Sequence, residues 1–201
     1  MVYEVVDNAI DEAMNGHARQ ICVTLHSDGS SVTVTDDGRG IPVDTHKKSK
    51  RSALEVIFTT LHAGGKFEQR TYQTAGGLHG VGASVVNALS KELIARSTRD
   101  GAQWEQHFTQ GKPTGPLRRI GRARGSGTTV FFRPDATIFP KTTFDADLIG
   151  NRLEIASYLH RGVAVVFKNE ATGTRQTFQH DEGLTDYLQQ ILRTREASPV
   201  H

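Results

Sequence analysis

A strand–turn–strand pattern near the start of the chain constrains the fold more than any other feature. Residues 21–26 (ICVTLH) and 32–35 (VTVT) read as two strands, and their apolar and polar side chains alternate in the way typical of a half-buried strand. The segment SDGS between them contains an Asp-Gly pair, the signature of a tight hairpin turn. Two strands joined this closely run antiparallel, which argues against a sheet built only from strand–helix–strand crossovers.

The remaining pattern predicts more strands and several helices. We expect strands at about 92–98, 104–109, 117–120, 128–133, 163–168 and 174–180, and helices at 2–15, 51–62, 83–90, 145–160 and 182–194. Strands joined by hairpins, with helices grouped between them, favour an α+β two-layer sandwich over a doubly wound parallel sheet. The 201 residues suffice for one domain with a real core, and we expect a single domain over 1–201.

Charge, cysteine content and hydropathy exclude several classes of protein. The 24 basic and 22 acidic residues nearly balance, so the chain as a whole is no strong electrostatic match for nucleic acid. The single cysteine, Cys22, excludes an internal disulfide and a multi-cysteine metal site. No apolar run reaches membrane-span length, and the N-terminus lacks a basic region followed by an apolar one. We therefore expect a soluble, cytoplasmic protein with no membrane partner.

The helix predicted at residues 2–15 has an acidic face that no basic residue on the helix balances. At about 100° per residue its polar side contains Glu4, Asp7, Asn8, Asp11, Glu12 and Asn15. Carboxylates three and four residues apart on a helix repel one another unless a cation lies above them. An ordinary solvated face is one explanation. The others are a Mg²⁺ ion that keeps most of its waters, and a carboxylate base that orients a water molecule.

The segment TVTDDGRGIP, residues 33–42, places an acid at the end of a strand and two glycines after it. Gly38 and Gly40 remove side chains where a flat ligand could approach the backbone. Asp36, at the end of the strand, can accept a hydrogen bond from an exocyclic amine. A tight turn without a ligand is the plain alternative, and the segment alone indicates a pocket for a nucleotide base.

A glycine-rich stretch over residues 61–90 predicts a phosphate-binding loop. Six glycines punctuate it, and a helix begins after the last of them: Gly64, Gly65, Gly76, Gly77, Gly80 and Gly82. Backbone amides exposed by glycines at a helix start bind phosphate. The stretch is neither a Walker A loop, because Phe67 follows Lys66, nor a dinucleotide fingerprint, because its spacing is G-x-x-G-x-G. A flexible surface loop is the alternative, but the length of the stretch favours a lid over a ligand.

Three of these segments together resemble one family. In order, EVVDNAIDEA, DDGRGIP and GGLHGVGASVVNALS are similar to motifs of the ATPase domain of the B subunit of bacterial type II topoisomerases. That domain belongs to the GHKL superfamily, with heat-shock chaperones, mismatch-repair proteins and sensor histidine kinases. The resemblance covers nearly the whole chain and is weaker beyond about Asp135. We favour the DNA gyrase branch over topoisomerase IV, although no motif separates the two.

The resemblance implies a fold, an activity and partners. The fold is the Bergerat two-layer sandwich, with a mixed, mostly antiparallel sheet and helices on one face. The substrate is ATP and the cofactor is Mg²⁺. In the intact protein, ATP-driven dimerisation of two B subunits is coupled to passage of double-stranded DNA, together with an A subunit. Competitive inhibitors of the ATP site, which make the family an antibiotic target, are further expected ligands.

The resemblance also assigns roles to residues. Glu4 is similar to the general base that activates the attacking water, and Asn8 to the side-chain ligand of Mg²⁺. Asp36 matches the residue that reads adenine, with Thr128 sharing a water molecule with it. Further ATP-binding residues implied by the match are Glu12 and Arg39 as an ion pair beside the pocket, Gly40, Ile41, Lys66, Tyr72, and the backbone of Gly77, Leu78, His79, Gly80, Val81 and Gly82. The implied inhibitor pocket is lined by Val5, Val34, Asp36, Arg39, Ile41, Arg99, Thr128 and Val130.

Two departures from the family pattern accompany these assignments. Gln73 occupies a position where many relatives carry a second lid lysine. Met1 begins inside the first motif helix. Relatives have an N-terminal arm before it that wraps the partner subunit, and this arm is not represented. The transducer domain that follows in relatives, and supplies a lysine to the γ-phosphate, is not represented either. We expect a fragment that is monomeric and weakly active.

Other functions remain open from sequence. A nucleotide-binding module that does not hydrolyse ATP, or an ATPase of the chaperone or mismatch-repair type, uses the same fold. Phosphoryl transfer of the histidine-kinase type is disfavoured, because Glu4 suits activation of water and the sequence lacks the helical hairpin with a phosphoacceptor histidine.

Overall fold

The computed structural model describes residues 1–45, 50–61 and 82–196, and its centre is one large sheet. The nine strands are β1 (Gln20–Leu25), β2 (Val32–Asp36), β3 (Ser90–Arg99), β4 (Ala102–Thr109), β5 (Lys112–Pro113), β6 (Arg118–Arg122), β7 (Gly127–Pro134), β8 (Ala164–Asn169) and β9 (Thr174–Phe178). Their order in space is β5-β4-β3-β7-β2-β1-β8-β9, and β6 pairs with β4 beside β5. Every pairing is antiparallel except that of β1 with β8.

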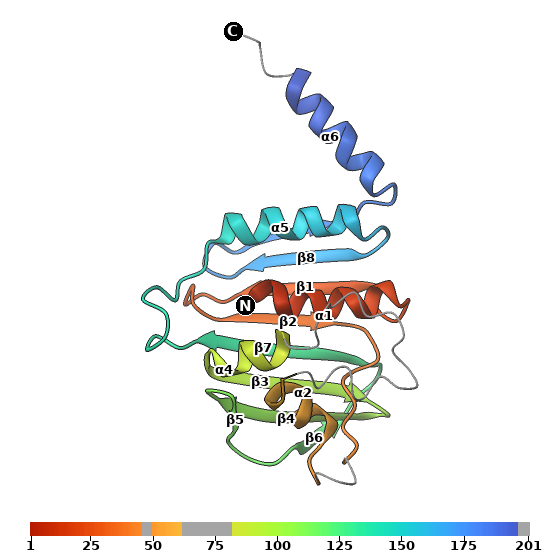
Figure 1. The fold of residues 1–201 in the computed structure, drawn as a ribbon. Helices are drawn as coiled ribbons and strands as arrows, with labels where there is room; N and C mark the ends of the chain where they lie inside the picture. Colours follow the sequence, from red (N-terminus) through yellow and green to blue (C-terminus); the bar gives the residue numbers. More distant parts are fainter. Residues whose placement is uncertain (46–49, 62–81, 197–201) are drawn as a thin grey trace.

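Four of the five described helices cover one face of this sheet (Figure 1). The helices are α1 (Val2–Met14), α2 (Ala53–Thr59), α4 (Gly82–Ala88), α5 (Ala146–Leu159) and α6 (Leu184–Glu196). The first four lie in front of the strands, whereas α6 extends away from the sheet beyond α5. The predicted α+β two-layer sandwich with a mixed, mostly antiparallel sheet is therefore confirmed.

The core forms between α1 and the strands below it. The buried side chains of α1 recur at the three- and four-residue spacing of an amphipathic helix: Val2, Val5, Val6, Ala9, Ile10 and Ala13. The strands β1 and β2 contribute every second residue, which matches the period of a strand. Burying each Val, Leu or Ile side chain contributes about 1.5–3 kcal/mol, so this packing fixes α1 over β2.

Every predicted element has a counterpart, with shifted ends. The helix expected at 51–62 covers only Ala53–Thr59: it begins after Ser52, whose hydroxyl accepts a hydrogen bond from the Glu55 amide at 3.0 Å, and it ends where the backbone becomes extended at Thr60. The strand expected at 92–98 extends over residues 90–99, and β5 has only two residues, too few to leave a pattern. Among the described helices, none is both long and apolar enough to cross a membrane.

Candidate nucleotide-binding site

Asp36 lies at the end of β2, in the middle of the sheet. It faces Ile21 of β1 on one side and Thr128 of β7 on the other. Its Oδ1 atom accepts hydrogen bonds from the backbone amides of Gly38 (2.9 Å) and Thr128 (3.3 Å). The residue is only 9 % exposed, and burial raises its carboxyl pKa to about 6.

The second carboxylate oxygen of Asp36 has a different environment. Within residues 1–45, 50–61 and 82–196, no hydrogen bond to Oδ2 is formed, whereas Oδ1 accepts two. The two hydrogen bonds to Oδ1 hold the carboxylate in place. Oδ2 has no donor among the described residues and is therefore suited to accept a hydrogen bond from a ligand. An amino group on a flat base is one such donor.

Glycines let the turn after β2 pack closely against β7 and β3. Gly127 has φ +152°, and a Cβ there would collide with the backbone carbonyl oxygen of Asp36. Gly40 has φ +74°, and a Cβ there would lie 2.5 Å from the carbonyl oxygen of Thr98. At both positions only glycine combines the backbone conformation with the available space.

The predicted ion pair between Glu12 and Arg39 is present and joins α1 to this turn. Arg39 Nη2 lies 2.7 Å from Glu12 Oε1, and Arg39 Nε donates to Glu12 Oε2 at 3.2 Å. The backbone amide of Arg39 also donates to Oε2, at 3.0 Å. Such a two-pronged, partly buried pair fixes geometry better than an exposed one. The role of the pair beside a base pocket stays a prediction.

The other side of the turn is held from β3. Arg99 Nη1 donates to the carbonyl oxygen of Gly40 at 3.2 Å, and the Ser97 hydroxyl donates to the carbonyl oxygen of Ile41 at 2.6 Å. Residues 38–41 are thus clamped between α1 and β3. The sequence predicts a place in the site for Arg99, Gly40 and Ile41, but the supporting Ser97 and Gly127 could not be recognised from it.

The acidic face of α1 is divided between two neighbours. Glu4 and Asn8 are exposed and lie one turn apart on α1. Glu4 lies close to Gly82, the first residue of α4: a Cβ added at Gly82 would have Glu4 Oε2 as its nearest neighbour. Asp7 instead faces α5. Burial and then the Glu4 charge raise its pKa, while His160 and Arg152 oppose that shift.

Cations from other elements therefore balance the acidic face in part. Arg39 pairs with Glu12, and His160 and Arg152 of the α5 region lie near Asp7. Burial lowers the His160 pKa, and the charges of Asp7 and Asp11 work against that lowering. The roles predicted for Glu4 and Asn8 at a ligand stay predictions.

The donor atoms on α1 fit a magnesium ion that is held mainly by other ligands. Across the described residues, no group of three or more His, Cys, Asp or Glu side chains is arranged to hold a metal ion. Asn8 offers one amide oxygen, next to the carboxylate of Glu4. Mg²⁺ commonly keeps several waters and takes one or two protein oxygens plus phosphate oxygens, so this sparse set suits a metal–nucleotide complex.

The apolar residues predicted for the pocket belong to the core around Asp36. Val34 and Val130 face each other across β2 and β7, and Val5 of α1 is buried with them. Ile41 is partly buried and packs against the same core. The predicted residues Lys66, Tyr72, Gly77, Leu78, His79, Gly80 and Val81 lie outside the described residues.

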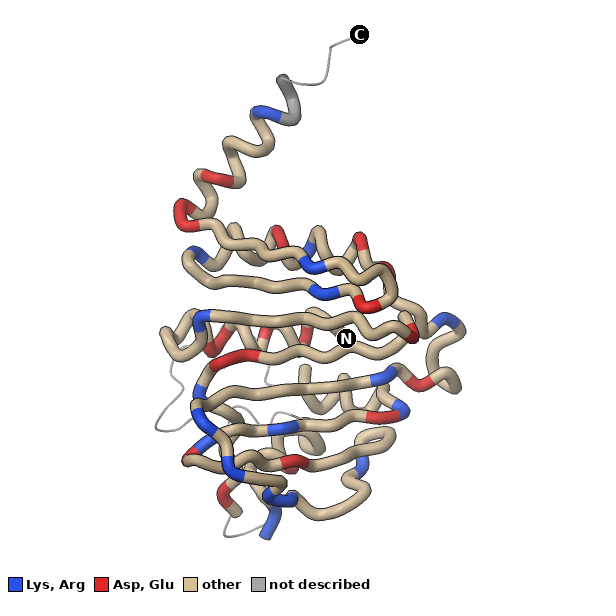
Figure 2. The backbone as a smooth tube through the Cα atoms, turned by 180° about the vertical axis from the view of Figure 1, so that it is seen from behind, with Lys and Arg blue, Asp and Glu red and all other residues tan. Residues whose placement is uncertain are grey.

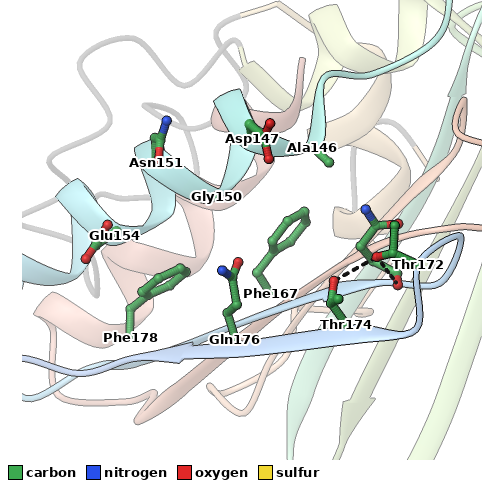
Figure 3. Close-up of a pocket in the computed structure, with 11 residues that line it drawn as sticks. Ala146, Asp147, Gly150, Asn151, Glu154, Phe167, Thr172, Thr174, Gln176 and Phe178 are labelled. Atoms are coloured by element: carbon green, nitrogen blue, oxygen red, sulfur yellow. Dashed lines mark hydrogen bonds between the residues drawn. The ribbon is translucent and has the colours of Figure 1, made fainter.

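A separate cavity of about 330 Å³ lies between α5 and the β8–β9 hairpin (Figure 3). Phe167, Gln176 and Phe178 rise from the strands toward α5, which contributes Asp147 and Glu154. None of the residues predicted from sequence lines it. The candidate site is therefore the region around Asp36 rather than this cavity.

Comparisons with known proteins show the family to which the chain belongs. The family described as histidine kinase-, DNA gyrase B-, and HSP90-like ATPase matches residues 1–138, which contain Glu4, Asp36 and Thr128. The B subunit of DNA gyrase from Thermotoga maritima is 49 % identical over 197 residues, which are 98 % of this chain and 31 % of that protein. The B subunit of the type 2 topoisomerase from Aquifex aeolicus is 43 % identical over 196 residues, 98 % of this chain and 25 % of that protein.

A solved structure agrees with the fold over most of the chain. The 43K ATPase domain of Thermus thermophilus gyrase B, crystallised in complex with an aminocoumarin, superposes with a TM-score of 0.84 and is 38 % identical. The match covers 94 % of this chain and 48 % of that one. The chain thus spans about a third or less of the length of these two curated relatives.

Proposed function

Because the chain belongs to the family of histidine kinase-, DNA gyrase B- and HSP90-like ATPases, we propose that it is the ATP-binding and ATP-hydrolysing domain of the B subunit of a type II topoisomerase. The identity of 42–49 % to proteins named as the B subunit of DNA gyrase or of a type 2 topoisomerase supports that branch. We favour gyrase over topoisomerase IV on the same names.

The state of Asp36 is the observation that carries this proposal. It is a buried carboxylate at a sheet end, fixed through Oδ1 by the amides of Gly38 and Thr128. Its Oδ2 can accept a hydrogen bond from the exocyclic amine of adenine, while Thr128 stands beside it. A guanine ring carries a carbonyl oxygen where adenine has that amine, so this site favours adenine over guanine.

Glu4 and Asn8 supply the chemistry at the phosphate end. Glu4 is an exposed carboxylate on the same helix as Glu12, which fixes the turn after Asp36. In our proposal it holds and deprotonates the water that attacks the γ-phosphate. Asn8 would hold Mg²⁺ through its amide oxygen, and the bound ion would neutralise charge on the phosphate oxygens.

The wider setting belongs to the proposal as well. In the longer protein, ATP binding would drive dimerisation of two B subunits and be coupled, with an A subunit, to passage of double-stranded DNA in the cytoplasm. The solved relative is in complex with an aminocoumarin, and we expect competitive inhibitors of that class to contact Arg39, Ile41 and Arg99 here.

Calorimetric titration of the 201-residue chain with a non-hydrolysable ATP analogue and Mg²⁺ tests the proposal. In Asp36→Asn, the amide nitrogen can face the adenine amine, and loss of a charge-assisted hydrogen bond costs about 1.5–3 kcal/mol, or roughly 10- to 150-fold in Kd. Asp37→Asn is the matched control. Asp37 is the exposed neighbour whose Oδ1 accepts from the amides of Arg19 (2.7 Å) and Gln20 (2.9 Å), away from the pocket. Equal Kd values for the wild type and Asp36→Asn would place the base elsewhere and remove the proposal.

A further inference from the structure

Strand β6 and the residues after it carry a concentrated positive charge. The segment RRIGRAR over 118–124 contains Arg118, Arg119, Arg122 and Arg124, all of them exposed, and no acidic residue. The whole chain has a net charge of only +2, so these four charges stand out locally. In Figure 2, basic positions recur along the end of the sheet that holds β6.

Among the described residues, no side chain neutralises these arginines. Within the described part of the chain, none of the four side chains forms a hydrogen bond or an ion pair. The acid closest in register is Glu105, opposite Arg118, and it is already engaged by Arg96 (2.5 Å) and His107 (2.7 Å). Four like charges on one short segment repel one another until an anion approaches.

The arginines lie on an open edge. Among the described strands, β6 pairs only with β4, and all five of its residues are exposed. Arg119 and Arg122 stand opposite Trp104 and Ala102 of β4, and Arg118 stands opposite Glu105. Residues directly opposite share a face, and Trp104 and Glu105 are neighbours on β4, so the guanidinium groups project from both faces of the edge.

The dimensions of the edge suit a nucleic-acid backbone. At about 3.3 Å per residue, the six steps from Arg118 to Arg124 span at most about 20 Å. One strand of DNA places a phosphate every 3.4 Å or so along the helix axis, so about six phosphates pass along this length. No aromatic residue occurs in 118–124 that could stack on a base, which favours contact with the backbone rather than with bases.

We propose that the arginine edge, defined as Arg118, Arg119, Arg122 and Arg124, binds the phosphate backbone of double-stranded DNA. Arginine binds phosphate with two parallel N–H donors, which suits a sequence-independent contact. The choice of DNA as the anion rests on the proposed function, in which this domain works beside DNA. The surface lies on β6 and the two residues after it, and it contains none of the residues assigned to the nucleotide site.

Fluorescence anisotropy of a labelled 30-base-pair duplex, titrated with the 201-residue chain at 50 to 200 mM salt, tests the arginine edge. Four phosphate contacts predict a log–log salt slope of about −3.6, or about a 150-fold loss of affinity over this range. Replacing the four arginines of the edge with glutamine should flatten the slope and weaken binding at 50 mM salt at least tenfold. Arg19, Arg161, Arg175 and Arg193 are also exposed, and replacing those four with glutamine changes the net charge equally. This control should keep the wild-type slope.

Three results would contradict the proposal that the arginine edge binds DNA: no binding to the duplex at 50 mM salt, an equal loss of affinity in the control variant, or tighter binding to polyglutamate than to DNA. The edge variant should bind the ATP analogue with the wild-type Kd, which shows that its fold is intact. Because that titration also tests the nucleotide site, failure of the arginine edge is distinguishable from failure of the proposed function.

Discussion

At the scale of single residues, the proposed role of Glu4 can be separated from binding. We expect Glu4→Gln to retain nucleotide affinity, because Asp36 and Thr128 are unchanged, and to lower ATP hydrolysis by about 10²- to 10⁴-fold, the usual contribution of a positioned base. The measurement compares Kd and turnover in a protein of the relatives' full length. Asp7→Asn is the matched control, since Asp7 lies on the same helix but faces α5. Turnover that persists in Glu4→Gln would remove Glu4 from the role.

The raised pKa of Asp36 predicts a pH dependence of binding. Burial brings this pKa to about 6, and the proposed contact to the adenine amine needs the charged form. The fraction of charged Asp36 is complete well above pH 6 and falls as the pH drops through 6. Affinity for the ATP analogue should therefore weaken by about tenfold per pH unit below 6. Calorimetry at pH 7.5, 6 and 5 measures this. Asp36→Asn controls for titration of the nucleotide itself, and identical profiles of the two proteins would refute the assignment.

At the scale of elements, the start of β7 helps to hold Asp36 in place, together with the Gly38 amide. Gly127 has φ +152°, and a Cβ there would collide with the Asp36 carbonyl, whereas Gly125 has φ +77° and open space around it. We expect Gly127→Ala to destabilise the fold by roughly 3 kcal/mol and Gly125→Ala by about 1 kcal/mol, from backbone strain alone. Thermal unfolding checks this, at about 2–4 °C of Tm per kcal/mol for a domain of this size. Similar shifts in both variants would show that the close approach to Asp36 is unimportant.

The local elements could be predicted because their signals lie within a few residues. The Asp-Gly hairpin, the apolar spacing of α1 and the acid at the end of β2 each follow from short-range periodicity or turn chemistry. The parallel pairing of β1 with β8 could not be predicted, because it joins segments about 140 residues apart and leaves no local pattern. The support that Ser97 and Gly127 give to the turn was missed for the same reason.

At the scale of the whole molecule, the site joins segments that are distant in sequence. Glu4 and Asn8 come from α1, Asp36 from β2 and Thr128 from β7, and the order of the sheet brings β2 and β7 together. The position of Asp36 on β2 could be predicted from sequence, but its hydrogen bond from the Thr128 amide could not, because that donor comes from the neighbouring strand. The fold therefore turns a strand-end acid into a buried acceptor.

Single-turnover hydrolysis of radiolabelled ATP, with protein in excess, tests most directly whether this domain is a hydrolase and not only a binding module. We expect ATP bound to the 201-residue chain to be converted slowly to ADP and phosphate, and faster in a protein of the relatives' full length. In relatives, a lysine of the transducer domain lies at the γ-phosphate. Loss of one such positioned cation costs on the order of 3 kcal/mol, near a hundredfold in rate, which is the difference we expect between the two lengths. Glu4→Gln should bind ATP and leave it intact in both lengths. If both wild-type proteins bind ATP but all of it is recovered intact, the domain is a binding module and not a hydrolase.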